Sequence, residues 1–125
     1  MLMNLHNLDY VILLCEDLPR MKAFYHEILG FLIVRDWDDW IEMQVGAVLI
    51  TLRKRGRPYD GAKLPDSAGV QLAFRVAPAE VDACFSELHL KGVEILEEPR
   101  DQDYGHRTLF FKDPEGNILE IYADI

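Results

Sequence analysis

The sequence predicts an α+β fold in which two tandem βαβββ modules form a curved mixed sheet around a concave cavity. Each half of the chain shows the same order of an apolar strand, a capped helix and three further strands. Glycines also repeat, since Gly30 and Gly92 follow the two predicted helices in the same way. We therefore predict one domain over residues 1–125, with module 1 at 1–52, a linker at 53–68 and module 2 at 69–125.

The first module begins with a predicted strand at Leu8–Cys15. Asp17 is a helix cap and Pro19 fits the first helical turn, so a helix is expected to run from there to Gly30. Its apolar stripe consists of Met21, Phe24, Ile28 and Leu29. Three strands follow, at Phe31–Arg35, Trp40–Val45 and Ala47–Leu52.

The second module repeats this order, beginning with a predicted strand at Gly69–Val76. Its helix opens at Pro78 and ends at Gly92, with Val81, Cys84, Phe85 and Leu88 as the apolar stripe. The later strands are expected at Val93–Glu97, Arg107–Lys112 and Ile118–Ala123. The additional residues of this module, around Glu98–His106, predict a loop that could act as a lid.

Composition narrows the function classes. The 125 residues are 50% hydrophobic, which suits one globular core, and their net charge of −9 disfavours a nucleic-acid partner. Apolar stretches are far shorter than the roughly 20 residues that span a bilayer, so no membrane partner is expected. The only cysteines, Cys15 and Cys84, lack metal-type spacing and predict a reduced, cytoplasmic protein.

Strand parity selects the side chains that face away from the helices. In module 2 these are Gln71, Ala73, Arg75, Ile118, Glu120 and Tyr122. We expect the four polar ones, Gln71, Arg75, Glu120 and Tyr122, to be neighbours. In module 1 the repeat assigns Tyr10, Ile12, Leu14, Val48, Ile50 and Leu52 to the same face, an almost wholly apolar wall. Such a surface is typical both of a small-molecule cavity and of a sheet covered by a partner.

The carboxylate of Glu120 has two interpretations. It forms a salt bridge with Arg75, or it binds a divalent metal together with other donors. The positions that align with Glu120 and Gln71 in module 1 are Ile50 and Tyr10, and neither is a usual ligand.

Two further segments carry unusual side chains. Arg53–Arg57 contains four basic residues and is interpreted as a solvated linker rather than a phosphate-binding patch. Trp37 and Trp40 flank two aspartates, and either pack in a hairpin or stack on a planar cation.

Two motifs give the chain a resemblance to a known superfamily. One is Leu8-Asp9-Tyr10-Val11 followed by Ala23-Phe24-Tyr25-His26-Glu27-Ile28-Leu29-Gly30-Phe31, and the other is Phe110-Phe111-Lys112-Asp113-Pro114-Glu115-Gly116-Asn117-Ile118-Leu119-Glu120-Ile121. They resemble the vicinal oxygen chelate superfamily, which groups glyoxalase I, bleomycin and fosfomycin resistance proteins, and extradiol dioxygenases. Motifs of this kind specify the fold more strongly than the function.

The resemblance implies a metal site at Tyr10, Gln71 and Glu120, of which only Glu120 keeps the most typical identity. Tyr10 stands where histidine is expected, so a bound divalent metal, if any, would rest on Gln71 and Glu120. The resemblance also places His106 at the border of the ligand cavity, as a general base or hydrogen-bond donor. It further implies a homodimer.

The sequence thus predicts that the protein binds a small aromatic or cationic molecule in a metal-free cavity. The ligand-binding residues would be Tyr10, Trp40, Gln71, Arg75, His106, Glu120 and Tyr122. The alternative is a divalent-metal-dependent lyase or dioxygenase acting on a substrate with adjacent oxygens. A third hypothesis is a structural or regulatory module whose concave face is covered by a partner.

Overall fold

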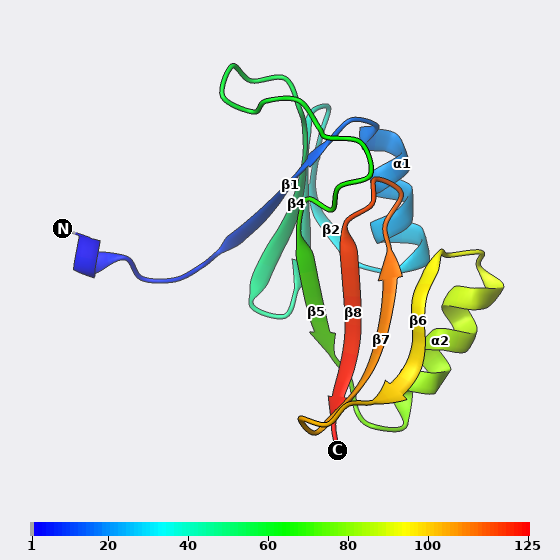
Figure 1. Cartoon of the computed structure of the whole chain (residues 1–125). Coiled ribbons are helices and arrows are strands. Elements are labelled where there is room, and N and C mark those ends of the chain that lie inside the picture. Colours follow the sequence, from blue (N-terminus) through cyan, green and yellow to red (C-terminus); the bar gives the residue numbers. More distant parts are fainter. Residues whose placement is uncertain (1) are drawn as a thin grey trace. The chain divides into compact units, whose positions relative to one another are not determined.

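The computed structural model describes residues 2–125, which divide into two compact units, with the boundary in the chain between Ala62 and Lys63. Each unit contains one four-stranded mixed sheet with helical segments against one face (Figure 1). The predicted α+β fold with tandem βαβββ modules is therefore confirmed. Among the described residues, no helix is both long and apolar enough to cross a membrane.

The first unit begins with a short 3-10 turn, η1, and an extended segment that leads into the sheet (Figure 1). Its first strand, β1, pairs in parallel with the last strand, β4, and the sheet order is β1-β4-β3-β2. The elements are η1 (Leu2–Asn4), β1 (Tyr10–Cys15), α1 (Leu18–Lys22), η2 (Ala23–Ile28), β2 (Leu32–Trp37), β3 (Trp40–Val45) and β4 (Val48–Lys54).

The helical segment of this unit changes type along its length. Asp17 caps α1 by accepting a hydrogen bond from the Arg20 amide at 3.1 Å, as its position before Pro19 predicts. The following η2 is a π-helix, in which each turn holds more residues than in an α-helix. Tyr25 is consequently buried with Met21 and Phe24, whereas the expected core positions Ile28 and Leu29 are only half-buried.

The second unit has the same topology, with the order β5-β8-β7-β6 and a parallel pair β5–β8. Its helix α2 buries Val81 and Leu88 against the sheet. This helix starts two residues after Pro78, because residues 77–80 form a turn in which the Glu80 amide donates to the Ala77 carbonyl. The elements are β5 (Gln71–Arg75), α2 (Glu80–Leu90), β6 (Ile95–Asp101), β7 (His106–Lys112) and β8 (Ile118–Asp124).

The predicted lid around Glu98–His106 is not a long loop. Residues up to Asp101 continue strand β6, and only four residues, 102–105, connect it to β7. The additional residues are absorbed by two irregularities in the β6–β7 pairing, between Ile95 and Glu97 and between Glu97 and Arg100. The lid prediction was wrong because bulges took up the residues that had been counted as a loop.

A buried ion pair holds the chain that follows β4. The Arg53 guanidinium donates two hydrogen bonds to the Asp60 carboxylate, at 2.8 and 3.0 Å, and the Asp60 side chain is almost fully buried. The same carboxylate also accepts from the amides of Gly56 and Arg57. These contacts hold the pKa of Asp60 well below its ordinary value, mainly through the Arg53 hydrogen bonds.

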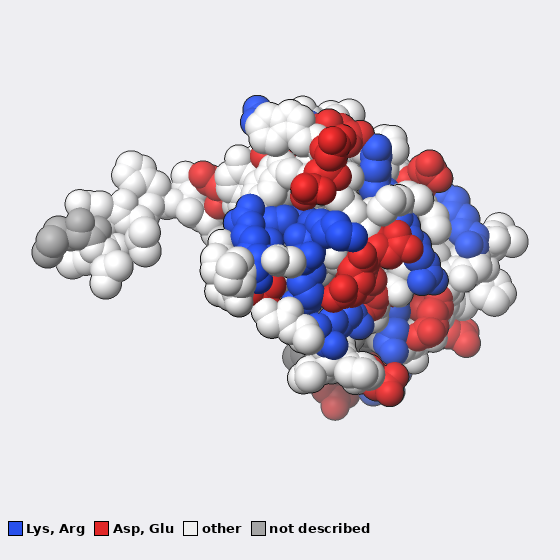
Figure 2. Space-filling model, turned by 90° about the horizontal axis from the view of Figure 1, so that it is seen from above, with Lys and Arg blue, Asp and Glu red and all other residues white. Residues whose placement is uncertain are grey.

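The arginines of the basic run Arg53–Arg57 form ion pairs and hydrogen bonds within their own unit. Arg55 forms an ion pair with Glu16 at 2.8 Å and donates to the carbonyls of Asp60 and Gly61. Lys and Arg side chains gather with Asp and Glu side chains on the surface that Figure 2 shows. The run is not solvated throughout as predicted, because Arg53 is buried in β4, and its arginines organise the turn through ion pairs and hydrogen bonds.

We predict that Asp60→Asn destabilises the protein in a pH-dependent way. The unfolded chain takes up a proton on Asp60 before the folded chain does, because the folded-state pKa is depressed. The stabilising contribution of this carboxylate is therefore complete above about pH 5 and declines as the pH falls below about 4. Urea unfolding at several pH values should give a stability difference between the natural chain and Asp60→Asn that is largest near neutral pH and narrows in acid.

The matched control is Asp103→Asn, which changes an exposed aspartate that has no partner within the part of the chain that the structure describes. Its unfolding free energy should follow that of the natural chain at every pH. A stability difference for Asp60→Asn that does not change with pH would contradict the assigned role of the ion pair.

Candidate functional site

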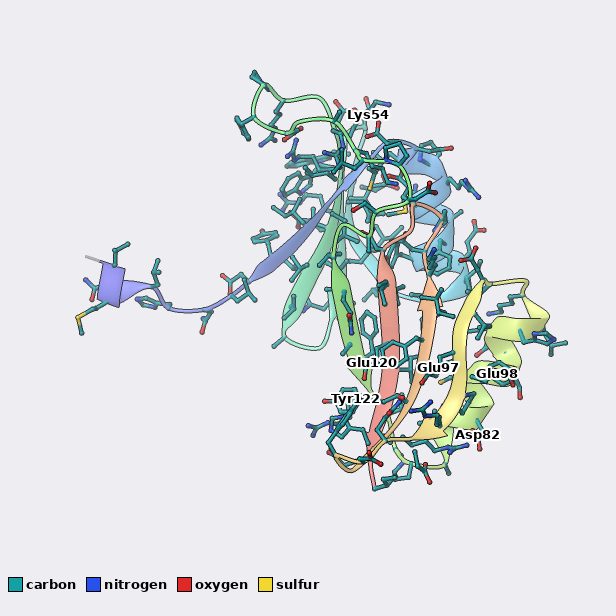
Figure 3. All side chains as sticks on the ribbon, viewed as in Figure 1. Lys54, Asp82, Glu97, Glu98, Glu120 and Tyr122 are labelled. Atoms are coloured by element: carbon teal, nitrogen blue, oxygen red, sulfur yellow. The ribbon has the colours of Figure 1, made fainter. Side chains whose placement is uncertain are left out.

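The face of the second sheet that points away from α2 carries most of the predicted site residues. The strand register places Glu120 between Ala73 of β5 and Phe110 of β7, and Tyr122 between Arg75 and Thr108. Figure 3 shows Glu120 and Tyr122 along β8. The structure thus makes Gln71, Arg75, Glu120 and Tyr122 neighbours, as strand parity predicted.

One end of this face carries a stack of rings. The His106 ring lies 4.6 Å from the Tyr122 ring at an interplanar angle of 25°, and the edge of Tyr104 packs against His106 at 5.2 Å. Arg75 lies on the same stack, with its guanidinium carbon 5.7 Å from the centre of the Tyr122 ring. We call these four residues, Tyr104, His106, Tyr122 and Arg75, the stacked cluster.

Hydrogen bonds and charges fix the stacked cluster. The Nε of Arg75 donates to the Tyr122 hydroxyl at 3.2 Å, and this bond raises the pKa of the Arg75 guanidinium. The Asp124 carboxylate lies 3.1 Å from His106 Nε2 and 3.7 Å from the Arg75 guanidinium. One carboxylate therefore orients both the His106 and the Arg75 side chains, and it is Asp124, not Glu120, that pairs with Arg75.

Glu120 lies beside this cluster with an amide as its neighbour. The Gln71 Nε2 donates to the Glu120 carboxylate at 3.4 Å, and Glu120 is only half-buried. No ion pair with a basic side chain is found for Glu120 among the described residues, so the predicted bridge to Arg75 is not formed. The carboxylate remains able to accept hydrogen bonds or to balance the charge of a cation.

A turn before β8 sets the position of Glu120. The buried carboxylate of Asp113 accepts from the amides of Glu115 and Asn117 and from the Asn117 side chain, at 2.8–3.0 Å. The Asn117 Oδ1 in turn accepts from the Val70 amide at 3.2 Å, next to the start of β5. The turn therefore fixes the register of the β5–β8 pair, from which Gln71 and Glu120 extend.

The first sheet places a different set of residues on its open face than predicted. Thr51 pairs with Ile12, the third residue of β1, just as Glu120 pairs with Ala73, the third residue of β5. Thr51, and not Ile50, is therefore the counterpart of Glu120. Ile50 and Leu52 are buried on the opposite face. The prediction aligned Gly46 with Gly116, but the β3–β4 connection has two residues and the β7–β8 connection has five, so the strands are offset by one.

This register makes the open face of the first unit less apolar than expected. Glu42 pairs with Thr51 across β3–β4, and both residues are buried. The Trp40 indole donates to Glu42 at 2.7 Å, and the Tyr10 and Trp40 rings lie 6.3 Å apart. The two predicted site residues of this unit, Tyr10 and Trp40, are therefore neighbours.

Glu42 and Thr51 were absent from the predicted site. Alternation within β3 alone could have found Glu42, since it stands two residues from Trp40 and shares its face. Thr51 required the correct strand offset, and its hydroxyl is buried without a hydrogen-bond partner. The alignment of Gly46 with Gly116 identifies neither residue.

The second unit brings together fewer metal-binding side chains than a divalent-metal site usually has. Gln71 and Glu120 supply two oxygen-bearing side chains, whereas divalent sites usually take three or more protein donors. No group of three or more His, Cys, Asp or Glu side chains that could hold a metal occurs within residues 2–125.

Comparison with known proteins identifies relatives over nearly the whole chain. Residues 7–121 match the model of the Glyoxalase/Bleomycin resistance protein/Dioxygenase superfamily. The protein YwkD of Bacillus subtilis is 30% identical, with 96% of this chain and 98% of that protein covered. The glutathione transferase FosA of Serratia marcescens is 26% identical, with 95% and 82% covered.

Solved structures share the architecture. A glyoxalase/bleomycin resistance protein/dioxygenase from Nocardioides superposes with a TM-score of 0.84 at 23% identity, covering 96% of this chain and 84% of that one, a likeness of fold. The virulence protein STM3117 of Salmonella typhimurium superposes with a TM-score of 0.75 at 26% identity, covering 97% and 98%.

We predict that Asp113→Ala destabilises the second unit and disturbs the Gln71–Glu120 pair. The substitution removes three hydrogen bonds to a buried carboxylate and should lower the unfolding free energy by about 2–3 kcal/mol. Chemical denaturation measures the loss. Asp103→Ala, in the exposed 102–105 turn, is the control and should change the free energy by less than about 0.5 kcal/mol. Equal effects of the two substitutions would contradict the role given to Asp113.

Proposed function

We propose that this chain, which belongs to the Glyoxalase/Bleomycin resistance protein/Dioxygenase superfamily, binds a small aromatic cation on the open face of its second unit. The observation that carries the proposal is the position of Glu120, a half-buried carboxylate beside a surface of stacked rings, for which residues 2–125 supply no basic partner. A flat molecule would stack on this surface while its positive charge is balanced by Glu120.

The charge of the unit supports a cationic ligand. Residues 63–125 contain 6 Lys and Arg against 13 Asp and Glu, which gives most of the chain's net charge of −9. Arg75, the arginine of the stacked cluster, is itself paired with Asp124. An acidic surface raises the local concentration of cations and speeds their association.

The binding mode requires no resident metal. Each group named above can stack, accept a hydrogen bond or neutralise charge without one. Metal-dependent lyase or dioxygenase chemistry is the competing function, and it is favoured by the contact between Gln71 and Glu120, which are two of the three positions at which the family resemblance places ligands. Elemental analysis separates the two functions.

We predict that benzamidine, a planar aromatic cation, binds more tightly than benzoate, which has the same ring and a negative charge. Glu120→Gln should lower the benzamidine affinity about tenfold, because it removes the balancing charge at the cost of about 1.4 kcal/mol. Tyr122→Leu should lower it as well, through loss of stacking. Isothermal titration calorimetry measures both effects.

Glu98→Gln provides the matched control, since Glu98 is an exposed glutamate on β6 (Figure 3). Its affinity should equal that of the natural chain. Equal losses for Glu98→Gln and Glu120→Gln would contradict the proposal. Stoichiometric metal in protein purified without chelator, lost in Glu120→Gln, would replace it with the metal-dependent function.

We also propose that the protein forms a homodimer. Its N-terminal arm, residues 2–8, projects from β1 (Figure 1) and exposes Leu2, Met3, Leu5 and Leu8, each between 74% and 96%. Apolar side chains gathered on an extended segment are typical of a protein–protein contact. A second copy of this chain is the partner that the family resemblance implies.

Deleting residues 2–7 should weaken or abolish the dimer without unfolding the sheets, because the strand pairing of β1 starts at Asp9. Size-exclusion chromatography with light scattering should give twice 14.4 kDa for the natural chain and a lower mass for the deletion. Leu90→Ser, which changes an exposed leucine on α2, should leave the mass unchanged. A natural chain of 14.4 kDa at micromolar concentration would contradict the dimer.

Neither cysteine forms a disulfide within residues 2–125, which supports a cytoplasmic location. Cys15 is buried, and burial raises the pKa of the Cys84 thiol, so neither is activated for oxidation.

A further inference from the structure

A second carboxylate lies on the same open face as Glu120, on the other side of β7. In the register of the second sheet, Phe110 of β7 stands opposite Glu120 of β8 and also opposite Glu97 of β6. The three side chains therefore form one row across three strands, with an aromatic ring between two carboxylates. Figure 3 labels the two glutamates, which come from the strands that flank β7.

The burial of neighbouring residues shows which face this row occupies. Leu109 and Phe111 stand on either side of Phe110 in β7, and both are fully buried on the face that packs against α2. Because side chains alternate along a strand, Phe110 points to the open face. Phe110, Glu97 and Glu120 are all half-buried, so a ligand lying over the ring has access to both carboxylates.

A bulge in β6 selects Glu97 for this row. Ile95 pairs with Phe111, and regular pairing would then place Leu96 opposite Phe110. The register shift between Ile95 and Glu97 brings Glu97 to that position instead. Bulges re-aim side chains and are common next to functional sites. The irregularity thus exchanges an apolar side chain for a carboxylate on the open face.

A neutral side chain holds Glu97 in place. The side-chain nitrogen of Gln102 donates to the Glu97 carboxylate at 3.1 Å and to the hydroxyl oxygen of the buried Thr108 at 2.9 Å. Arg100 donates to the Gln102 side-chain oxygen at 3.5 Å, and no ion pair between Arg100 and Glu97 is found among residues 2–125. The Glu97 carboxylate is therefore oriented by an amide, which leaves its negative charge available to a cation.

We propose that the ligand of the second unit is an aromatic dication, with one positive group for Glu120 and a second for Glu97. This inference rests on the proposed function and adds a second charge to it. Neighbouring strands are about 4.8 Å apart, so the two glutamates are separated by about 10 Å across β7. The positive groups of the ligand have a similar separation, and its rings lie between them over Phe110, beside the stacked cluster.

Two biphenyl probes differ only in the number of charges. Biphenyl-4,4′-dicarboxamidine carries two amidinium groups at a separation that matches the two carboxylates, and biphenyl-4-carboxamidine carries one. Calorimetric titration should give about fivefold tighter binding for the dication, the gain expected of one exposed ion pair.

A shorter dication controls for the general attraction of a doubly charged molecule to an acidic surface. In benzene-1,3-dicarboxamidine the two charges are too close together to reach both carboxylates. Its affinity should exceed that of benzamidine by no more than about twofold, the statistical advantage of two equivalent ends.

Three substitutions assign the two charges. Glu97→Gln removes the charge and keeps an oxygen that can accept from Gln102, so it should weaken the biphenyl dication about fivefold and leave the biphenyl monocation unchanged. Glu120→Gln should weaken both probes. Glu98→Gln changes the next residue of β6, an exposed glutamate, and as the matched control it should affect neither probe. Unchanged binding of the monocation to Glu97→Gln also shows that this variant is folded.

The inference is overturned if the biphenyl dication gains no more than the short dication does. It is also overturned if Glu97→Gln and Glu98→Gln change the affinity of the biphenyl dication equally. In both cases the proposed function stands as long as the monocation binds and Glu120→Gln weakens it. If none of the amidines binds, the proposed function fails and this inference fails with it.

Discussion

The buried carboxylate of Asp113 holds the turn on which the candidate site depends. Because the Asp113 side chain accepts three hydrogen bonds, the residues between β7 and β8 are held in one conformation. Asn117 connects this turn to the beginning of β5, since its side-chain oxygen accepts a hydrogen bond from the Val70 amide. Gly69 adds to it, since a Cβ atom at that position would lie 2.8 Å from the Asn117 oxygen. The parallel pair β5–β8 therefore has one register, and that register decides that Gln71, Glu120 and Tyr122 share a face.

Much of this arrangement could be predicted from the sequence, because alternation and turn residues act over short distances. The capped α1, the duplicated topology and the open face of the second unit follow from local patterns such as Asp17-Leu18-Pro19 and Gln71–Arg75. The offset of β4 could not be predicted, because it depends on the length of a hairpin connection. An error of one residue there exchanged Ile50 for Thr51 and turned a polar face into an apolar one.

The partner of a charged side chain was equally hard to predict. Arg75 was expected to pair with Glu120. It lies instead against Tyr122 and Asp124, which stand two and four residues after Glu120 in β8. Parity restricts a side chain to a face and does not choose among several acids on that face. The π-helix at Ala23–Ile28 escaped detection for a related reason, since its sequence also fits α-helical spacing and only the packing of Tyr25 distinguishes the two.

The parallel pairing of first and last strands also has a consequence for biosynthesis. In each unit the opening strand meets its hydrogen-bonding neighbour only after a helical segment and two intervening strands have been made. During translation, β1 and later β5 must wait as unpaired, partly apolar segments until β4 and β8 emerge. The same topology that places β1 and β5 at one edge of their sheets thus leaves both strands unpaired in the nascent chain, where they are exposed to aggregation and to chaperones.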